Sequence, residues 1–136
     1  MGSVERRLGP ERARTAHAWR SLCDSGARLD LVSDWPGSFN EQQKIPLAPL
    51  ENIALAVGRE WHPEQALTVA EAVAAYTANP AYASYEEDRK GSISEGKLAD
   101  LVVLSRDILA LKAEGIRSTR VDVTILGGRV IHRRAD

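Results

Sequence analysis

The 136-residue chain is long enough for one domain with a sizeable core. Its 18 lysines and arginines balance 19 aspartates and glutamates, which argues against a nucleic-acid or membrane-surface partner. The single cysteine, Cys23, excludes an internal disulfide, and no apolar run approaches the about 18 residues that cross a bilayer, so we expect a soluble cytoplasmic protein.

The chain opens with a predicted helix and a predicted strand. Apolar residues recur at spacings of three and four over residues 11–25, which predicts a helix that ends in a left-handed cap at Gly26. Residues 28–33 have the alternating side-chain pattern of a strand. They are too few to form a helix before Pro36, so we predict a strand here. A helix followed by a short strand is half of an α/β repeat.

The middle of the chain is predicted to be helical. Glycine and proline interrupt residues 36–49, which we expect to be a loop and a candidate for binding. Residues 50–59 read as a helix. Thr68 and Glu71 match a capping box, which predicts the start of another helix whose apolar stripe faces the core. We expect these two residues to cap that helix and to have no other role. A short second helix is expected after it, with Asn79 as its cap.

The last 50 or so residues change to a β pattern. Residues 98–104 predict a strand, and residues 121–126 and 129–132 predict two more. The Gly127-Gly128 pair between the last two is typical of a two-residue hairpin turn, where positive φ is required.

One carboxylate stands where the first predicted strand ends. Asp34 precedes Trp35 and Pro36, and a carboxylate at the carboxyl end of a buried parallel strand is typical of barrel active sites. The alternatives are that Asp34 only caps nearby amides, and that Trp35 fills the barrel mouth instead of lining a substrate pocket. Asp100 and Lys97 are expected to be structural, and Cys23 a core residue.

The order of these motifs resembles the C-terminal part of the amidohydrolase superfamily, closest to its YtcJ-like metal-dependent hydrolases (amidohydrolase family 3). The resemblance covers roughly residues 8–133. It rests on the segments Trp19–Leu22, Gly26–Leu29, Ser33–Pro36, Ile53–Glu60, Leu67–Ala72, Tyr76–Asn79, Gly91–Ile93, Gly96–Leu104 and Gly127–Val130.

The resemblance implies an α/β architecture: a (β/α)8 barrel that carries a divalent metal, usually zinc, beside a small β-sandwich. Residues 1–86 would supply the last β/α unit and closing helices of the barrel. Residues 87–136 would supply the C-terminal strands of the sandwich. Asp34 resembles the family aspartate that ligates the metal and takes a proton from the attacking water, and Trp35 would line the substrate pocket. The implied activity is hydrolysis of non-peptide C–N bonds in a small molecule.

The chain also departs from a working enzyme of that family. Its three histidines, His17, His62 and His132, form no His-x-His pair, and a catalytic zinc takes about three protein ligands. Asp30 stands where the family usually has a small apolar residue, and it would need a partner such as Arg28 or would raise local pKa values through like-charge repulsion. We therefore expect no tight metal site in the chain alone, which would be a fragment of a longer enzyme or a truncated reading frame.

Three partners follow as expectations: the small-molecule substrate of the complete enzyme, a missing N-terminal half, or a second copy of this chain. The competing interpretation is a non-catalytic remnant that serves as an oligomerisation or partner-binding module. In either case the strand at residues 28–33 and the sandwich strands would lack neighbours, so we expect exposed apolar surface.

Overall fold

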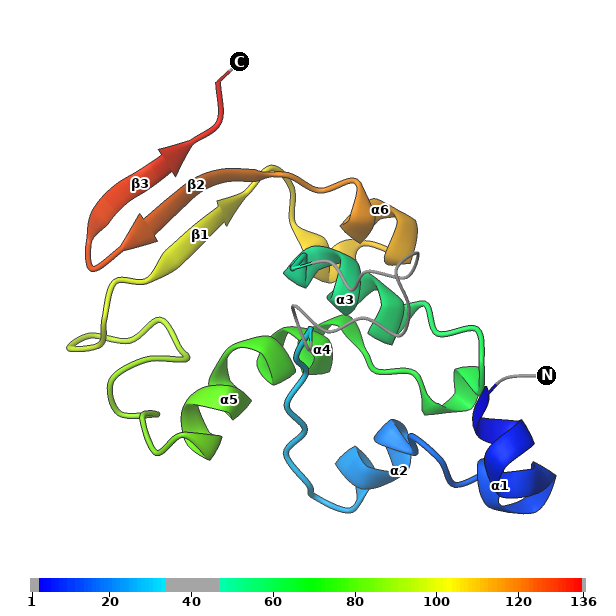
Figure 1. The fold of residues 1–136 in the computed structure, drawn as a ribbon. Coiled ribbons are helices and arrows are strands. Elements are labelled where there is room, and N and C mark those ends of the chain that lie inside the picture. Colours follow the sequence, from blue (N-terminus) through cyan, green and yellow to red (C-terminus); the bar gives the residue numbers. More distant parts are fainter. Residues whose placement is uncertain (1–2, 34–46, 136) are drawn as a thin grey trace.

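The computed structural model describes residues 3–33 and 47–135, which form a group of helices followed by a small antiparallel sheet (Figure 1). In chain order the elements are α1 (Ser3–Ala13), α2 (Trp19–Asp24), α3 (Pro49–Val57), η1 (Pro63–Gln65), α4 (Val69–Tyr76), α5 (Ala78–Ala83), β1 (Leu101–Leu104), η2 (Ile108–Ala110), α6 (Ala113–Arg117), β2 (Val121–Leu126) and β3 (Arg129–Arg133). None of the helices in these ranges has the length and apolar character needed to cross a membrane.

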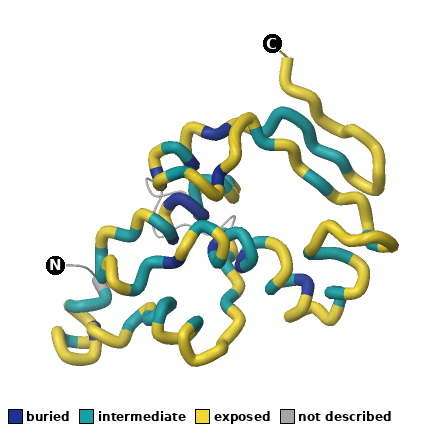
Figure 2. Tube along the Cα trace, turned by 180° about the vertical axis from the view of Figure 1, so that it is seen from behind, coloured by how far each residue is buried: buried dark blue, intermediate teal, exposed yellow. Residues whose placement is uncertain are grey.

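The core lies where α3, α4, η2 and α6 meet. Figure 2 shows the buried stretches among the helices, whereas the sheet is intermediate or exposed. The apolar stripe predicted on α4 faces this core, which confirms that part of the pattern. The buried members of the cluster are Ile53, Ala54, Ala56, Leu67, Ala72, Ile108, Ala113 and Ile116.

The predicted capping box at the start of α4 is present. The Glu71 amide donates to the Thr68 hydroxyl at 3.3 Å, and the Thr68 amide donates to the Glu71 carboxylate at 2.8 Å. The predicted cap of α5 was wrong, because the helix begins at Ala78 and Asn79 lies inside it. The Asn79 side chain instead donates to the carbonyl of Leu29 at 2.9 Å, a partner 50 residues away.

The helix predicted over residues 11–25 is divided in the structure. α1 continues only to Ala13 and contains a kink at Gly9, and α2 begins at Trp19. Between them His17 has a φ of 52°, which interrupts the helix and leaves its carbonyl free to accept a hydrogen bond from Arg59 at 2.7 Å. A contact between distant residues thus outweighs the local apolar spacing.

The strand predicted over residues 28–33 is not a strand in the structure. This extended segment lies beside α4, where the Leu31 amide donates to the Ala75 carbonyl at 3.0 Å (Figure 1). A strand requires a ladder of hydrogen bonds to a neighbouring strand. Within the described ranges the only sheet is β1–β2–β3, so no neighbour is available to this segment.

The sheet has the strand order β1–β2–β3 with antiparallel pairing throughout. The predicted hairpin is confirmed: Leu126 pairs with Arg129, and both glycines between them have positive φ, 54° and 79°. Apolar side chains of all three strands remain in contact with solvent; Val102 is 57% and Ile131 60% exposed. These exposed side chains agree with the expectation of uncovered apolar surface.

We predict that Gly91→Ala destabilises the protein more than Gly96→Ala. Both glycines have positive φ, 90° and 84°, so a Cβ atom costs each about 1–2 kcal/mol. At Gly91 the new Cβ would also lie 2.5 Å from the Cβ of Ala81, whereas it meets nothing within 4 Å at Gly96. The additional overpacking should lower the free energy of unfolding by a further ~1–3 kcal/mol, measured by urea denaturation. Equal losses in the two variants would contradict this packing.

Candidate functional site

The segment that leads to Asp34 is fixed at several points. α2 ends in a Schellman motif, in which the Gly26 amide donates to Cys23 and the Ala27 amide donates to Leu22. Gly26 has a φ of 88°, which confirms the predicted left-handed cap. From there the chain extends past α5 and α4, where Leu29 accepts a hydrogen bond from Asn79 and Leu31 donates one to Ala75, and both leucine side chains pack against the core.

Asp34 and Trp35, the predicted catalytic and pocket residues, lie outside the described residues, as does most of the predicted loop. The structure ends its first described range at Ser33, one residue before Asp34. The segment that leads to the candidate carboxylate is held against α4 and α5 as far as Leu31.

Asp30 has no ion pair with Arg28 in the described part of the chain. The Arg28 guanidinium instead stacks over the ring of Tyr82, 3.9 Å from its centroid. Asp30, Arg28 and Tyr82 share the wall of an open depression together with Asn79. Since Asp30 is exposed to water, it does not need the partner that the sequence suggested.

The histidines do not converge on a metal site. Over residues 3–33 and 47–135 no group of three or more His, Cys, Asp or Glu side chains could hold a metal ion. His17 and His62 both contact Trp61 edge-on, with ring centroids 5.9 Å and 4.3 Å from the centroid of its ring. His132 lies exposed on β3.

Glu71 does more than cap its helix, which corrects the sequence interpretation. Its carboxylate forms a two-point ion pair with Arg20 of α2, with the Arg20 Nη1 atom 2.6 Å from Glu71 Oε1. The Arg20 bonds, together with those from Thr68, hold the pKa of Glu71 at about 2. The same guanidinium donates to the Ala66 carbonyl, so one side chain joins α2 to the start of α4.

Asp100 and Lys97 have the structural roles that the sequence predicted. Asp100, just before β1, accepts a hydrogen bond from the Gly127 amide at 2.7 Å. This bond fixes the turn between β2 and β3 against the start of β1. Lys97 donates to the Glu87 carbonyl and, at 2.7 Å, to the Ser92 hydroxyl. Cys23 packs at the core edge, and burial raises the pKa of its thiol, with a further contribution from Glu71.

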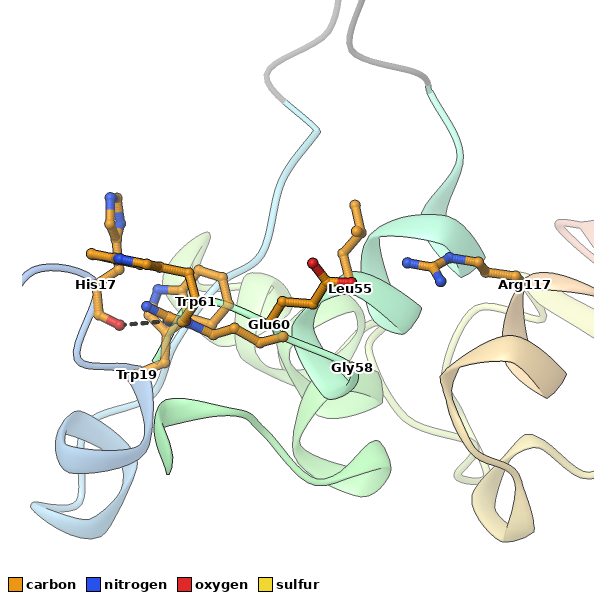
Figure 3. Close-up of a pocket in the computed structure, with 8 residues that line it drawn as sticks. His17, Trp19, Leu55, Gly58, Glu60, Trp61 and Arg117 are labelled. Carbon is orange, nitrogen blue, oxygen red and sulfur yellow. Dashed lines mark hydrogen bonds between the residues drawn. The ribbon is translucent and has the colours of Figure 1, made fainter. Parts of the chain in front are cut away.

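Sequence reasoning missed an open cavity of about 500 Å³ near the start of α2, the segment that follows α3, and α6 (Figure 3). Arg59 is among the residues that line it, and its guanidinium lies 4.5 Å from the ring centroid of Trp19 and 5.2 Å from that of Trp61. The residues that line it are His17, Trp19, Leu55, Gly58, Arg59, Glu60, Trp61 and Arg117. Its aromatic and basic residues are up to 100 positions apart, so no short motif announces the cavity.

The chain matches known proteins over nearly its whole length. It is 36% identical over 115 residues to the N-substituted formamide deformylase of Arthrobacter pascens, a match that covers 85% of this chain and 21% of that protein. It is 30% identical over 138 residues to the putative amidohydrolase YtcJ of Bacillus subtilis, which covers 95% of this chain and 25% of that protein.

A solved structure and a family model agree with these relatives. The crystal structure of an amidohydrolase from Thermotoga maritima MSB8 superposes with a TM-score of 0.65 at 28% identity, covering 87% of this chain and 26% of that one. The chain spans about a quarter or less of the length of these relatives. The model of the amidohydrolase family, family 3, matches residues 1–132. The chain therefore belongs to the amidohydrolase family.

Proposed function

We propose that this chain is the C-terminal part of a metal-dependent amidohydrolase that hydrolyses non-peptide C–N bonds in small molecules. The observation that carries the proposal is the family match over residues 1–132 together with 36% identity to a protein named for deformylation of N-substituted formamides. In this proposal residues 1–86 complete a (β/α)8 barrel, and residues 87–136 complete a β-sandwich beside it.

Within that enzyme, Asp34 would help to hold the metal and would accept a proton from water, and Trp35 would line the substrate pocket. A divalent metal such as zinc supplies a bound water whose pKa lies near ~7. The anchored segment of residues 26–33 supports this role, because a proton acceptor must be held within hydrogen-bond reach of its water.

The described residues do not fit a zinc site by themselves. Zinc in hydrolases takes about three protein ligands, and these ranges contain no group of three suitable side chains. The remaining ligands therefore belong to barrel strands that the proposed complete enzyme contributes. No step of the reaction is assigned to residues of the described ranges.

A second candidate function is a non-catalytic module that joins copies of this chain or binds a separate N-terminal half. The uncovered apolar residues of the sheet favour it, since both faces of β1 expose valines, Val102 at 57% and Val103 at 48%. Sheets that are open in this way pair readily with another strand or pack against another sheet.

The test is a chimera in which residues 1–136 replace the matched segment of the Arthrobacter pascens deformylase. We expect the zinc-loaded chimera to release amine from an N-substituted formamide, and the deformylase that lacks the segment to release none. The isolated chain serves as the second control, with its oligomeric state measured by sedimentation. A folded but inactive chimera, together with a self-associating chain, would support the non-catalytic module instead.

A further inference from the structure

The cavity between α2, α3 and α6 is a candidate binding site separate from Asp34. Its volume of about 500 Å³ is within the range of small-molecule pockets, and its walls are mostly apolar. Every residue that lines it belongs to the described ranges. None of them is Asp34 or Trp35, the residues of the proposed hydrolytic site.

One end of the cavity is an aromatic wall held in a fixed arrangement. Arg59 lies against Trp19 and Trp61, and its Nη1 and Nε atoms donate to the carbonyls of His17 and Trp61. The Trp61 indole nitrogen also donates to Glu5 at 3.4 Å. A wall built in this way offers a flat π surface that needs little reordering when an aromatic ring packs on it.

The other end of the cavity presents opposite charges. Figure 3 shows Glu60 and Arg117 reaching from different elements toward Leu55, which lies between them. Arg117 uses its Nε atom for Glu51 at 3.0 Å, which leaves its terminal nitrogens available for a second acceptor. In the ranges that the structure describes, Glu60 forms no ion pair, with Arg117 or with any other cation.

We propose that this cavity binds a zwitterion that carries an aromatic ring, of which an aromatic α-amino acid is the simplest example. The ring packs on Trp61, the ammonium group binds Glu60, and the carboxylate binds Arg117. An amine without a carboxylate would leave the terminal nitrogens of Arg117 without a second acceptor. An acid without an amine would place its carboxylate near Glu60, so each lone charge is disfavoured.

The test is calorimetric titration of the 136-residue chain with L-phenylalanine. A ligand of this size should saturate the site at about 1 mM or tighter. Three analogues each lack one element of the proposed ligand: phenethylamine lacks the carboxylate, 3-phenylpropionate lacks the ammonium group, and L-alanine lacks the ring. We expect each to bind at least about tenfold more weakly, because each loses a charge-assisted hydrogen bond or the aromatic contact.

Matched variants separate the site from general effects of charge. Glu60→Gln and Arg117→Gln should weaken phenylalanine binding about tenfold or more. Glu51→Gln breaks the same ion pair as Arg117→Gln but keeps the guanidinium, and Glu114→Gln removes an exposed carboxylate of α6 outside the cavity. Glu114→Gln should bind like the parent chain, and Glu51→Gln at least as tightly, because it removes the carboxylate that competes for Arg117. Circular dichroism checks that every variant is folded.

Two results would overturn the proposal. One is the absence of saturable phenylalanine binding up to about ten times the expected constant, in a chain whose circular dichroism shows the helices. The other is equal binding of phenylalanine and the two singly charged analogues, or equal binding by Glu60→Gln and its control. Neither result depends on hydrolysis, so failure here is distinguishable from failure of the proposed function.

Discussion

Replacing Asp34 by asparagine in the chimera is expected to lower kcat for hydrolysis about 10²- to 10⁴-fold. The amide keeps the size of the side chain but can neither take up a proton nor donate negative charge to a metal, and a positioned proton acceptor contributes about this factor. The measurement is amine release under saturating substrate and zinc.

Asp30→Asn is the matched control for this variant. Asp30 lies four residues earlier on the same anchored segment, is exposed to water, and lines an open depression with Arg28. We expect its kcat to remain within about twofold of the parent, because an exposed carboxylate in water contributes little to a distant site. Comparable losses in both variants would assign the effect to the segment's structure and contradict the role of Asp34.

The second large effect is expected at Glu71, through stability and not through activity. Glu71→Gln removes the ion pair with Arg20 and weakens the capping box with Thr68, which together should lower the free energy of unfolding by about 1–2 kcal/mol at pH 7. The carboxylate is 35% exposed, so solvent screens the ion pair and keeps the loss small. Urea denaturation followed by circular dichroism measures the change.

The pH dependence gives this prediction a direction. The pKa of Glu71 falls from 4.5 to about 2 in the folded protein, chiefly because Arg20 donates to it. The contribution of the Glu71 carboxylate to the free energy of unfolding is therefore complete above about pH 4.5. It is lost as the pH falls toward 2, where the carboxylate of the folded protein takes up its proton. The parent should lose stability over this range, whereas Glu71→Gln should lose less.

Glu86→Gln provides the comparison for that experiment. Glu86 also has a lowered pKa, from its bonds with Lys90 and Ser84, but its partners lie within four residues on the surface. Glu86 joins no elements that are distant in the chain. Glu86→Gln should therefore lower the free energy of unfolding less than Glu71→Gln does. A Glu71→Gln variant no less stable than Glu86→Gln would contradict the role of Arg20 in joining α2 to α4.

The sequence predicted local structure that short-range chemistry determines. The capping box at Thr68, the left-handed cap at Gly26 and the hairpin at Gly127-Gly128 all depend on residues within a few positions of one another. Asp100 and Lys97 were also expected from their motif to be structural, although Asp100 binds the Gly127 amide, 27 residues away, and so joins the hairpin turn to the start of β1.

The parts that sequence reasoning missed depend on contacts between distant residues. Residues 28–33 alternate like a strand, yet a strand forms only where a partner strand lies beside it, and here α4 takes that place. The helix over residues 11–25 is divided because the His17 carbonyl binds Arg59, 42 residues away. The second role of Glu71 depends on Arg20 in the same way, 51 residues earlier in the chain.

The candidate site was predicted from one motif, Asp34-Trp35-Pro36, and the structure describes the chain up to Ser33. The family match agrees with the resemblance to amidohydrolases that this motif suggested. The roles of Asp34 and Trp35 stay predictions. The aromatic cavity had no sequence signal, because most of its lining residues lie in the segments beside α2 and α3, and only the fold brings these segments close to α6.

The most direct test is the zinc content of the chimera after gel filtration, measured beside its Asp34→Asn variant and the isolated 136-residue chain. If the hydrolytic centre needs both this chain and the rest of a barrel, the chimera retains zinc, the variant loses much of it, and the isolated chain retains none. An isolated chain that keeps stoichiometric zinc and releases amine from a formamide would contradict the account.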